Sequence, residues 1–226
     1  MKKLISVLLV SVLVLLGTTS CDLLQRLDTF LYGDYHYNCD CDNGCDEFVT
    51  IAGREFCALS HFVNIDERFV LTERYIQILE SLTNLRSLVL SNNRITDISL
   101  LKSLTNLQSL AIRGNPITDI SPLESLTNLW DLSIWDTQVT DISPLKSLTN
   151  LQMLSLNGNP ITDFSPLESL TDLRWLTLWN SQITDISPLE SLTNLRDLSL
   201  DDSSLTMEQI EELRVKLPET YIRFRD

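Results

Sequence analysis

LTNLQSLAIRGNPITDISPLES, residues 104–125, is one of five closely similar units of 22 residues that follow one another from Leu82 to Ser191. The other units begin at Leu82, Leu126, Leu148 and Leu170, and the start of a sixth lies at Leu192. A fixed period of roughly 20 to 50 residues is the signature of a solenoid, in which every unit packs against its two neighbours. The repeat therefore decides the fold.

Each unit contains one strand and one return segment. Apolar residues alternate in the first half, as at Leu110 and Ile112, so one set of side chains points inward at every second residue. Stacked units therefore predict a parallel sheet. The second half ends in Ser-Pro-Leu in four units, for example at Ser121, Pro122 and Leu123. This pattern favours a short helical turn with serine as the N-cap and proline at the first helical position.

A polar residue follows each strand, where its side chain can bond the backbone of the neighbouring turns. The column consists of Asn93, Asn115, Thr137, Asn159, Ser181 and Ser203. Because asparagine occupies only half of these positions, we expect a weaker ladder of hydrogen bonds at the C-terminal end.

From Leu59 to Ser204 the chain resembles the leucine-rich-repeat proteins of the 22-residue class, and among bacterial proteins the internalin family. The resemblance implies an α/β fold, a curved right-handed solenoid with a parallel sheet on the concave face and short helical or 3-10 turns on the convex face. It also implies binding of a macromolecule on the concave sheet, without identifying that macromolecule.

The departures from the repeat predict the organisation of the chain. We expect a signal peptide (1–20), a tether and cysteine-rich cap (21–47), a hairpin with a degenerate first repeat (48–81), the repeats (82–203) and a C-terminal helix-strand cap (204–226). Apolar residues follow a helical period at 71–79 and 205–213, and a short strand is expected at 221–224. Terminal caps are needed because only internal units are covered on both sides.

The first residues resemble a bacterial export signal. Lys2 and Lys3 precede an apolar run from Leu4 to Leu16, which is shorter than the roughly 20 residues that span a bilayer. Cys21 follows small residues, as in the lipobox of bacterial lipoproteins, although Thr18 stands where that family usually has leucine. We expect Cys21 to be acylated and to anchor the protein in the cell envelope; cleavage and secretion is the alternative.

Lipidation of Cys21 would leave an even number of cysteines. The remaining four are Cys39, Cys41, Cys45 and Cys57. In an oxidising compartment they are candidates for two disulfides, whose pairing the spacing does not determine. A four-cysteine zinc site is the alternative, but paired CxxC motifs are absent. We therefore expect no metal site and no cofactor.

Charge limits the classes of partner. The chain has 17 basic and 31 acidic residues, and loss of the signal with its two lysines gives a formal charge of −16. Nucleic acid is therefore not an expected partner, and membrane contact is expected only through the N-terminal lipid. A neutral or basic protein ligand fits this charge better than an acidic one.

The outward positions of the strands form the candidate ligand-binding site. All four tryptophans of the chain fall at or beside these positions, and none occupies a core leucine position. Exposed tryptophans are typical of binding hot spots. With the neighbouring polar residues, the predicted site is Trp130, Asp131, Trp135, Asp136, Asn157, Trp175, Trp179, Asp197 and Asp201. Trp135 and Trp179 share a column two strands apart, with backbones about 10 Å from each other.

Other interpretations of this aromatic surface remain open. The tryptophans can pack on one another, or stack on sugar rings of a glycan. A structural envelope protein without a specific ligand also fits the composition. In addition, the two units from Leu104 match the two units from Leu148, so a duplication of 44 residues explains the common register of Trp135 and Trp179.

Catalysis has little support in the sequence. The two histidines, His36 and His61, belong to no metalloprotease motif, nucleophile elbow or plausible triad. The aspartates of Thr-Asp-Ile-Ser recur in every unit, which marks them as turn residues. We therefore predict a non-enzymatic protein that mediates protein–protein interaction.

Overall fold

The computed structural model describes residues 82, 84–201 and 205–225, and the backbone of three short strands that precede them. These strands are β1 (Phe48–Ile51), β2 (Arg54–Cys57) and β3 (Phe62–Ile65). The signal peptide, the helix expected at 71–79 and four of the cysteines lie outside the described residues. Cys57 is described only as the last residue of β2, so the lipid anchor and the disulfides remain predictions.

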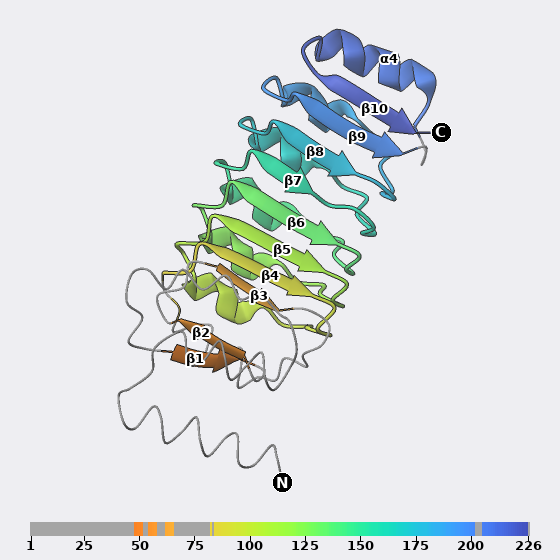
Figure 1. Ribbon diagram of the computed structural model, residues 1–226. Helices are drawn as coiled ribbons and strands as arrows, with labels where there is room; N and C mark the ends of the chain where they lie inside the picture. Colours follow the sequence, from red (N-terminus) through yellow and green to blue (C-terminus); the bar gives the residue numbers. More distant parts are fainter. Residues whose placement is uncertain are drawn as a thin grey trace, which may run out of the picture.

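The repeats form one parallel sheet of eight strands, in the order β10-β9-β8-β7-β6-β5-β4-β3 (Figure 1). The strands after β3 are β4 (Ser87–Ser91), β5 (Ser109–Arg113), β6 (Asp131–Trp135), β7 (Met153–Ser155), β8 (Trp175–Leu178), β9 (Asp197–Asp201) and β10 (Tyr221–Arg225). Neighbouring strands pair with a constant offset of one unit, as in Leu88 with Leu110 and Leu110 with Leu132. The predicted solenoid is confirmed.

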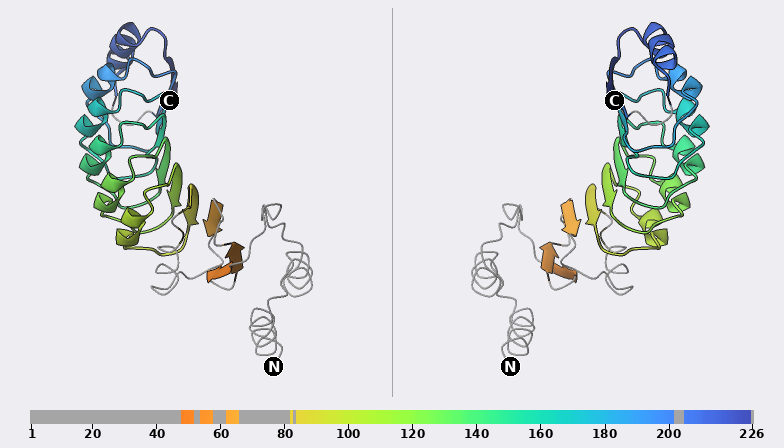
Figure 2. Two further views of the ribbon diagram at one scale, coloured as in Figure 1. Left: turned by 90° about the vertical axis from the view of Figure 1, so that its left-hand side faces the viewer. Right: turned by 90° about the vertical axis from the view of Figure 1, so that its right-hand side faces the viewer.

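Short 3-10 helices form the other side of the solenoid. They are η2 (Ser99–Ser103), η3 (Ser121–Ser125), η4 (Ser143–Ser147), η5 (Ser165–Ser169) and η6 (Ser187–Ser191). Figure 2 shows that the stack of coils is curved, with the strands on the inner side and the 3-10 helices on the outer side. The sheet is therefore the concave face.

The predicted N-cap of these helices is wrong. In η3 the N-cap residue is Ile120, and Ser121 is the first helical residue, so Pro122 takes the second position. The carboxylate of Asp119 accepts a hydrogen bond from the Ser121 backbone N–H at 2.8 Å. The same bond recurs in the other four turns at 2.7–2.9 Å. The charged carboxylate, two residues before the serine, satisfies the free N–H and replaces the weaker hydroxyl acceptor.

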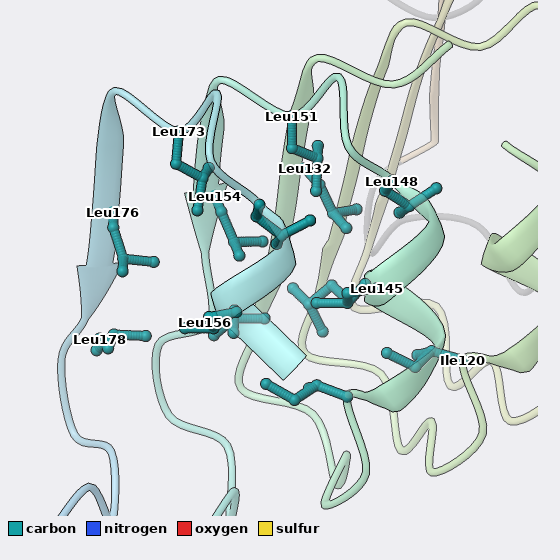
Figure 3. Packing of buried hydrophobic residues seen from close by; sticks show 14 of the residues in the cluster. Ile120, Leu132, Leu145, Leu148, Leu151, Leu154, Leu156, Leu173, Leu176 and Leu178 are labelled. Carbon is teal, nitrogen blue, oxygen red and sulfur yellow. The ribbon is translucent and has the colours of Figure 1, made fainter. Parts of the chain in front are cut away.

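The core is a continuous column of leucine and isoleucine between the two layers. Leu132, Leu154 and Leu176, from successive strands, point inward and meet return-segment residues such as Leu145 and Leu148 (Figure 3). All five side chains are essentially inaccessible to solvent. Because each unit contributes the same positions, the inward and outward sets of side chains keep one register along the array.

The two ends of the array differ from the internal units. At the N-terminal end β1 and β2 pair in antiparallel fashion, and β3 adds the first strand of the parallel sheet. At the C-terminal end the helix α4 (Met207–Lys216) replaces the 3-10 turn, and β10 pairs with β9. Thr206 and Gln209 form a capping box at the start of α4, which satisfies two free backbone N–H groups.

The hydrogen bonds made by the polar column that follows the strands depend on residue type. The amide of Asn115 accepts from the backbone N–H groups of Asn93 and Ile95 at 2.9 and 3.1 Å, and donates to two carbonyls. Thr137 donates its hydroxyl to Asn159 at 2.5 Å. In contrast, the buried hydroxyl of Ser181 has no hydrogen-bond partner among the described residues. The short serine side chain does not span the distance that asparagine bridges.

Candidate functional site

The concave face consists of three columns of outward side chains, one from each alternate strand position. The middle column is small, from Val89 and Ala111 to Ser133, Ser155, Thr177 and Ser199. On β6, β7 and β8 larger side chains stand on either side of it, whereas β4 and the start of β5 have serine there. On β6, β7 and β8 the face is therefore a floor of small residues between two rows of larger ones.

Trp130, Met153 and Trp175 form a patch at the start of the strands, which we call the apolar strip. Their side chains are 41%, 37% and 43% exposed. Met153 and Trp175 are register partners on β7 and β8, while the carbonyl of Trp130 accepts the N–H of Met153 at 2.9 Å. Met153 and Trp175 are the first residues of β7 and β8, and Trp130 directly precedes β6. Met153 is absent from the predicted site, although its outward position in the repeat could have identified it.

Trp135 is held by its neighbours and differs from the other tryptophans. It is half-buried, and its indole N–H donates to the hydroxyl of Ser155. The guanidinium of Arg113, from the preceding strand, lies 5.7 Å from the centre of the ring, a distance that allows a cation–π contact. The sequence pairs Trp135 with Trp179, but one face and the only donor of Trp135 are already engaged.

Trp179 lies directly after β8 and is the most exposed of the tryptophans at 45%. Its backbone N–H donates to the side-chain oxygen of Asn157 at 2.8 Å, and its carbonyl accepts the N–H of Gly158. Asn157 therefore fixes the backbone of the next coil. The indole ring itself has no interaction with the described residues beyond packing, so it remains available to a ligand.

The predicted aspartates differ in their partners. Asp197 forms an ion pair with Arg223 at 2.6 Å, and Asp136 lies 3.8 Å from the Nε of Arg113. Asp201 accepts the backbone N–H of Asn180. These carboxylates are therefore already stabilised by groups of the protein itself.

Asp131 is the exception among these aspartates. Its Oδ2 accepts the hydroxyl of Ser109 at 2.9 Å, and it forms no ion pair with any residue that the structure describes. It is half-buried and lies between Ser109 and Met153 in the sheet register. A negative charge that forms no ion pair with a described residue therefore stands at one end of the apolar strip.

The backbone adopts a left-handed conformation shortly after each strand from β4 to β8. The residues with positive φ in this column are Asn92, Gly114, Asp136, Gly158 and Asn180. A Cβ atom on Gly114 would collide with the side chain of Asn92, and one on Gly158 would collide with that of Asp136. The predicted site residue Asp136 thus has a role in the turn, because asparagine, aspartate and glycine tolerate this conformation best.

The convex side carries aspartates that serve the turns. Hydrogen bonds from the serine two residues later hold the pKa of four of them below the ordinary value of 3.8. In Asp97, Asp141 and Asp163 the serine backbone N–H is the largest cause, and in Asp185 it is the serine hydroxyl. Their position in every unit and their local bonds indicate a structural role.

Metal binding and membrane insertion are two alternative roles for the described part of the chain. No group of three or more histidine, cysteine, aspartate or glutamate side chains there could hold a metal ion. Within those same residues, no helix has the length and apolar character required to cross a membrane.

Comparison with known proteins agrees with this geometry. The family described as Leucine Rich repeats (2 copies) matches residues 83–125, 127–169 and 171–214. Among solved structures, internalin C2 from Listeria monocytogenes is similar over 73% of this chain and 80% of its own, with 28% sequence identity and a TM-score of 0.60. A comparison with curated protein sequences finds no match.

A second solved structure widens the comparison beyond Listeria. A leucine-rich-repeat protein of Leptospira interrogans is similar over 69% of this chain and 40% of its own, with 27% identity and a TM-score of 0.62. The present chain therefore spans less than half of that protein.

Proposed function

Because this chain belongs to the leucine-rich-repeat family, we propose that it is a non-enzymatic binding protein whose concave face takes up a protein partner. One observation carries this proposal: Met153 and Trp175 are exposed register partners on β7 and β8, and the exposed Trp130 and Trp179 lie directly before β6 and directly after β8. Large apolar side chains gathered on a rigid surface are typical of interaction sites, since their burial by a partner removes much apolar area from water.

The rigidity of the sheet supports the same conclusion. Met153 and Trp175 extend from strands that are paired on both sides, as β7 is with β6 and β8, and Trp130 directly precedes such a strand. Tryptophan loses little rotamer freedom on binding and provides a large contact area, which is why it is frequent among hot-spot residues. We infer that Trp130, Trp175 and Trp179 are the main anchors, and that Trp135 holds the floor of the site in place.

We further propose that the protein is exported and attached to a bacterial membrane through an acyl chain on Cys21. Support comes from the sequence of the first 21 residues, with two lysines, an apolar run and small residues before the cysteine. Metabolic labelling with palmitate tests this point. Label in the wild-type chain and none in Cys21→Ala is expected, whereas export without label would favour secretion.

The binding proposal is tested by selection from a displayed library of short linear peptides on the full-length chain. Enriched peptides should bind the Trp130→Ala, Trp175→Ala double variant at least about 30-fold more weakly, because hot-spot tryptophans contribute 2 kcal/mol or more. Val215→Ala is the matched control, since Val215 is an exposed apolar residue on α4, away from the concave sheet.

Two results would contradict the proposal. Equal peptide binding by the wild-type chain and the double variant would show that the strip is not the site. Binding to a glycan array that requires Trp130 and Trp175, without any peptide selection, would assign the surface to carbohydrate.

A further inference from the structure

The first residues of strands β5 to β9 form one outward column, which places a charge beside the apolar strip. In the direction of the stack it runs from Ser109 through Asp131, Met153 and Trp175 to Asp197. An aspartate therefore stands at each end of the Met153–Trp175 pair. Any ligand that covers this pair must also contact, or approach closely, the two carboxylates.

The two carboxylates are not equivalent. Asp197 is already neutralised by Arg223 of the C-terminal strand. Asp131 accepts only the hydroxyl of Ser109 and has no ion-pair partner among the described residues. Covering Asp131 with an apolar group would remove water from an unpaired charge, which is unfavourable. A cationic group at this point would instead supply the missing partner.

The spacing of the column also constrains the ligand. Neighbouring strands are about 4.8 Å apart, so Asp131 is about 5 Å from Met153 and about 10 Å from Trp175, measured along the column. The middle of the Met153–Trp175 pair is thus about 7 Å from Asp131. In an extended peptide, side chains two residues apart point to the same side and are separated by about 6.8 Å. The distance from Asp131 to the middle of the Met153–Trp175 pair thus matches the separation of these peptide side chains.

We propose that the protein partner lays an extended segment across the strands, with a lysine or arginine paired to Asp131 and an aromatic or aliphatic residue two positions away packed on Met153 and Trp175. The inference rests on the proposed function, because it specifies what the apolar strip binds. The small middle column allows the backbone of such a segment to approach the sheet closely. The selected motif is a basic residue, any residue, and an apolar residue.

The test uses the same peptide library on three forms of the full-length chain. Wild-type protein should enrich the basic-any-apolar motif, and Asp131→Lys should enrich an acidic residue at the first position. Peptides selected on the wild type should bind Asp131→Lys at least about 10-fold more weakly, as expected when a close charge pair becomes a repulsion. Glu168→Lys makes the same change of charge on η5, on the convex side, and should leave the selected motif unchanged.

The outcomes separate this inference from the proposed function. Peptides that require Trp130 and Trp175, yet show the same sequences on the wild type and on Asp131→Lys, would overturn the inference alone. Absence of any peptide that requires the two tryptophans would overturn both. Sedimentation that detects a dimer of the wild type, lost in the tryptophan double variant, would assign the strip to a second copy and also overturn the inference. Circular dichroism of each variant verifies that the fold is kept.

Discussion

Asp172→Asn is expected to stabilise the protein, although it replaces an exposed charged residue by a neutral one. In the turns before β6, β7 and β9, an asparagine side chain donates to a threonine carbonyl of the preceding coil. The bond lengths are 2.8 Å for Asn128, 2.8 Å for Asn150 and 2.9 Å for Asn194. Asp172 occupies the same position in its unit but has no N–H group to donate. The ladder is therefore interrupted at a single coil.

The magnitude follows from the geometry of the intact bonds. A net intramolecular hydrogen bond contributes about 0.5–1.5 kcal/mol, and solvent exposure of this turn favours the lower half of that range. Asp172 forms no hydrogen bond or ion pair with another described residue, so no existing interaction is lost in the exchange. We expect a gain of about 0.5–1 kcal/mol, or roughly 1–4 °C in melting temperature for a chain of this size.

Urea unfolding at pH 7, followed by circular dichroism, measures this difference. The reverse change, Asn150→Asp, is the matched control and should lower the unfolding midpoint by a similar amount. If Asn150→Asp destabilises the protein but Asp172→Asn does not stabilise it, the fifth coil cannot form the bond that its neighbours form. If neither variant shifts the midpoint, the outer asparagine ladder contributes no stability and the reasoning is refuted.

Three further sets of variants test other parts of the fold. Gly158→Ala should lower the free energy of unfolding by about 1–2 kcal/mol, because φ is +66° there and a side chain disfavours this region, whereas Asn180→Gly should be neutral or stabilising in the same urea titration. Asn159→Ala should lower the free energy of unfolding by about 3 kcal/mol, because its buried hydrogen bonds are lost. Ser181→Ala should change that free energy little, because the serine hydroxyl has no partner among the described residues. Thermal melts of both variants compare the two positions. The lowered pKa values of Asp97, Asp141, Asp163 and Asp185 stabilise the fold above about pH 4, and this contribution is lost as pH falls through the folded-state pKa values. Replacing all four by asparagine should make the urea midpoints between about pH 2 and 5 less dependent on pH. An unchanged pH dependence would contradict this assignment.

The period of the repeat was sufficient to predict the sheet. Because each strand is offset from its neighbour by one unit, the inward leucines and the three outward columns follow directly from the alignment of the units. Asp131, Met153 and Trp175 could therefore be placed side by side before any coordinates were known. The 3-10 turns and the strand at 221–224 were also accessible from local patterns, since Ser-Pro-Leu and alternating apolar residues have well-defined preferences.

The partners of individual side chains could not be predicted in the same way. Whether Trp135 is free depends on the rotamers of Arg113 and Ser155, which come from neighbouring units and are set by packing. The predicted N-cap is wrong because serine and aspartate both accept backbone hydrogen bonds, and only the turn geometry decides between them. The ion pairing of Asp131 and Asp197 could not be predicted either, because only Asp197 pairs with Arg223 of the C-terminal strand.

The alternation of glycine with longer residues in the left-handed column limits how this array can change in length. The side chains of Asn92 and Asp136 each occupy space that the glycine of the following coil leaves open. Deletion of a single unit containing Gly158 would bring Asp136 next to Asn180, and two side chains would then compete for one space. Deletion of two consecutive units would retain the alternation. From Asn92 to Asn180, the loss or gain of two coils therefore keeps this alternation, whereas a change of one coil requires a side chain to move.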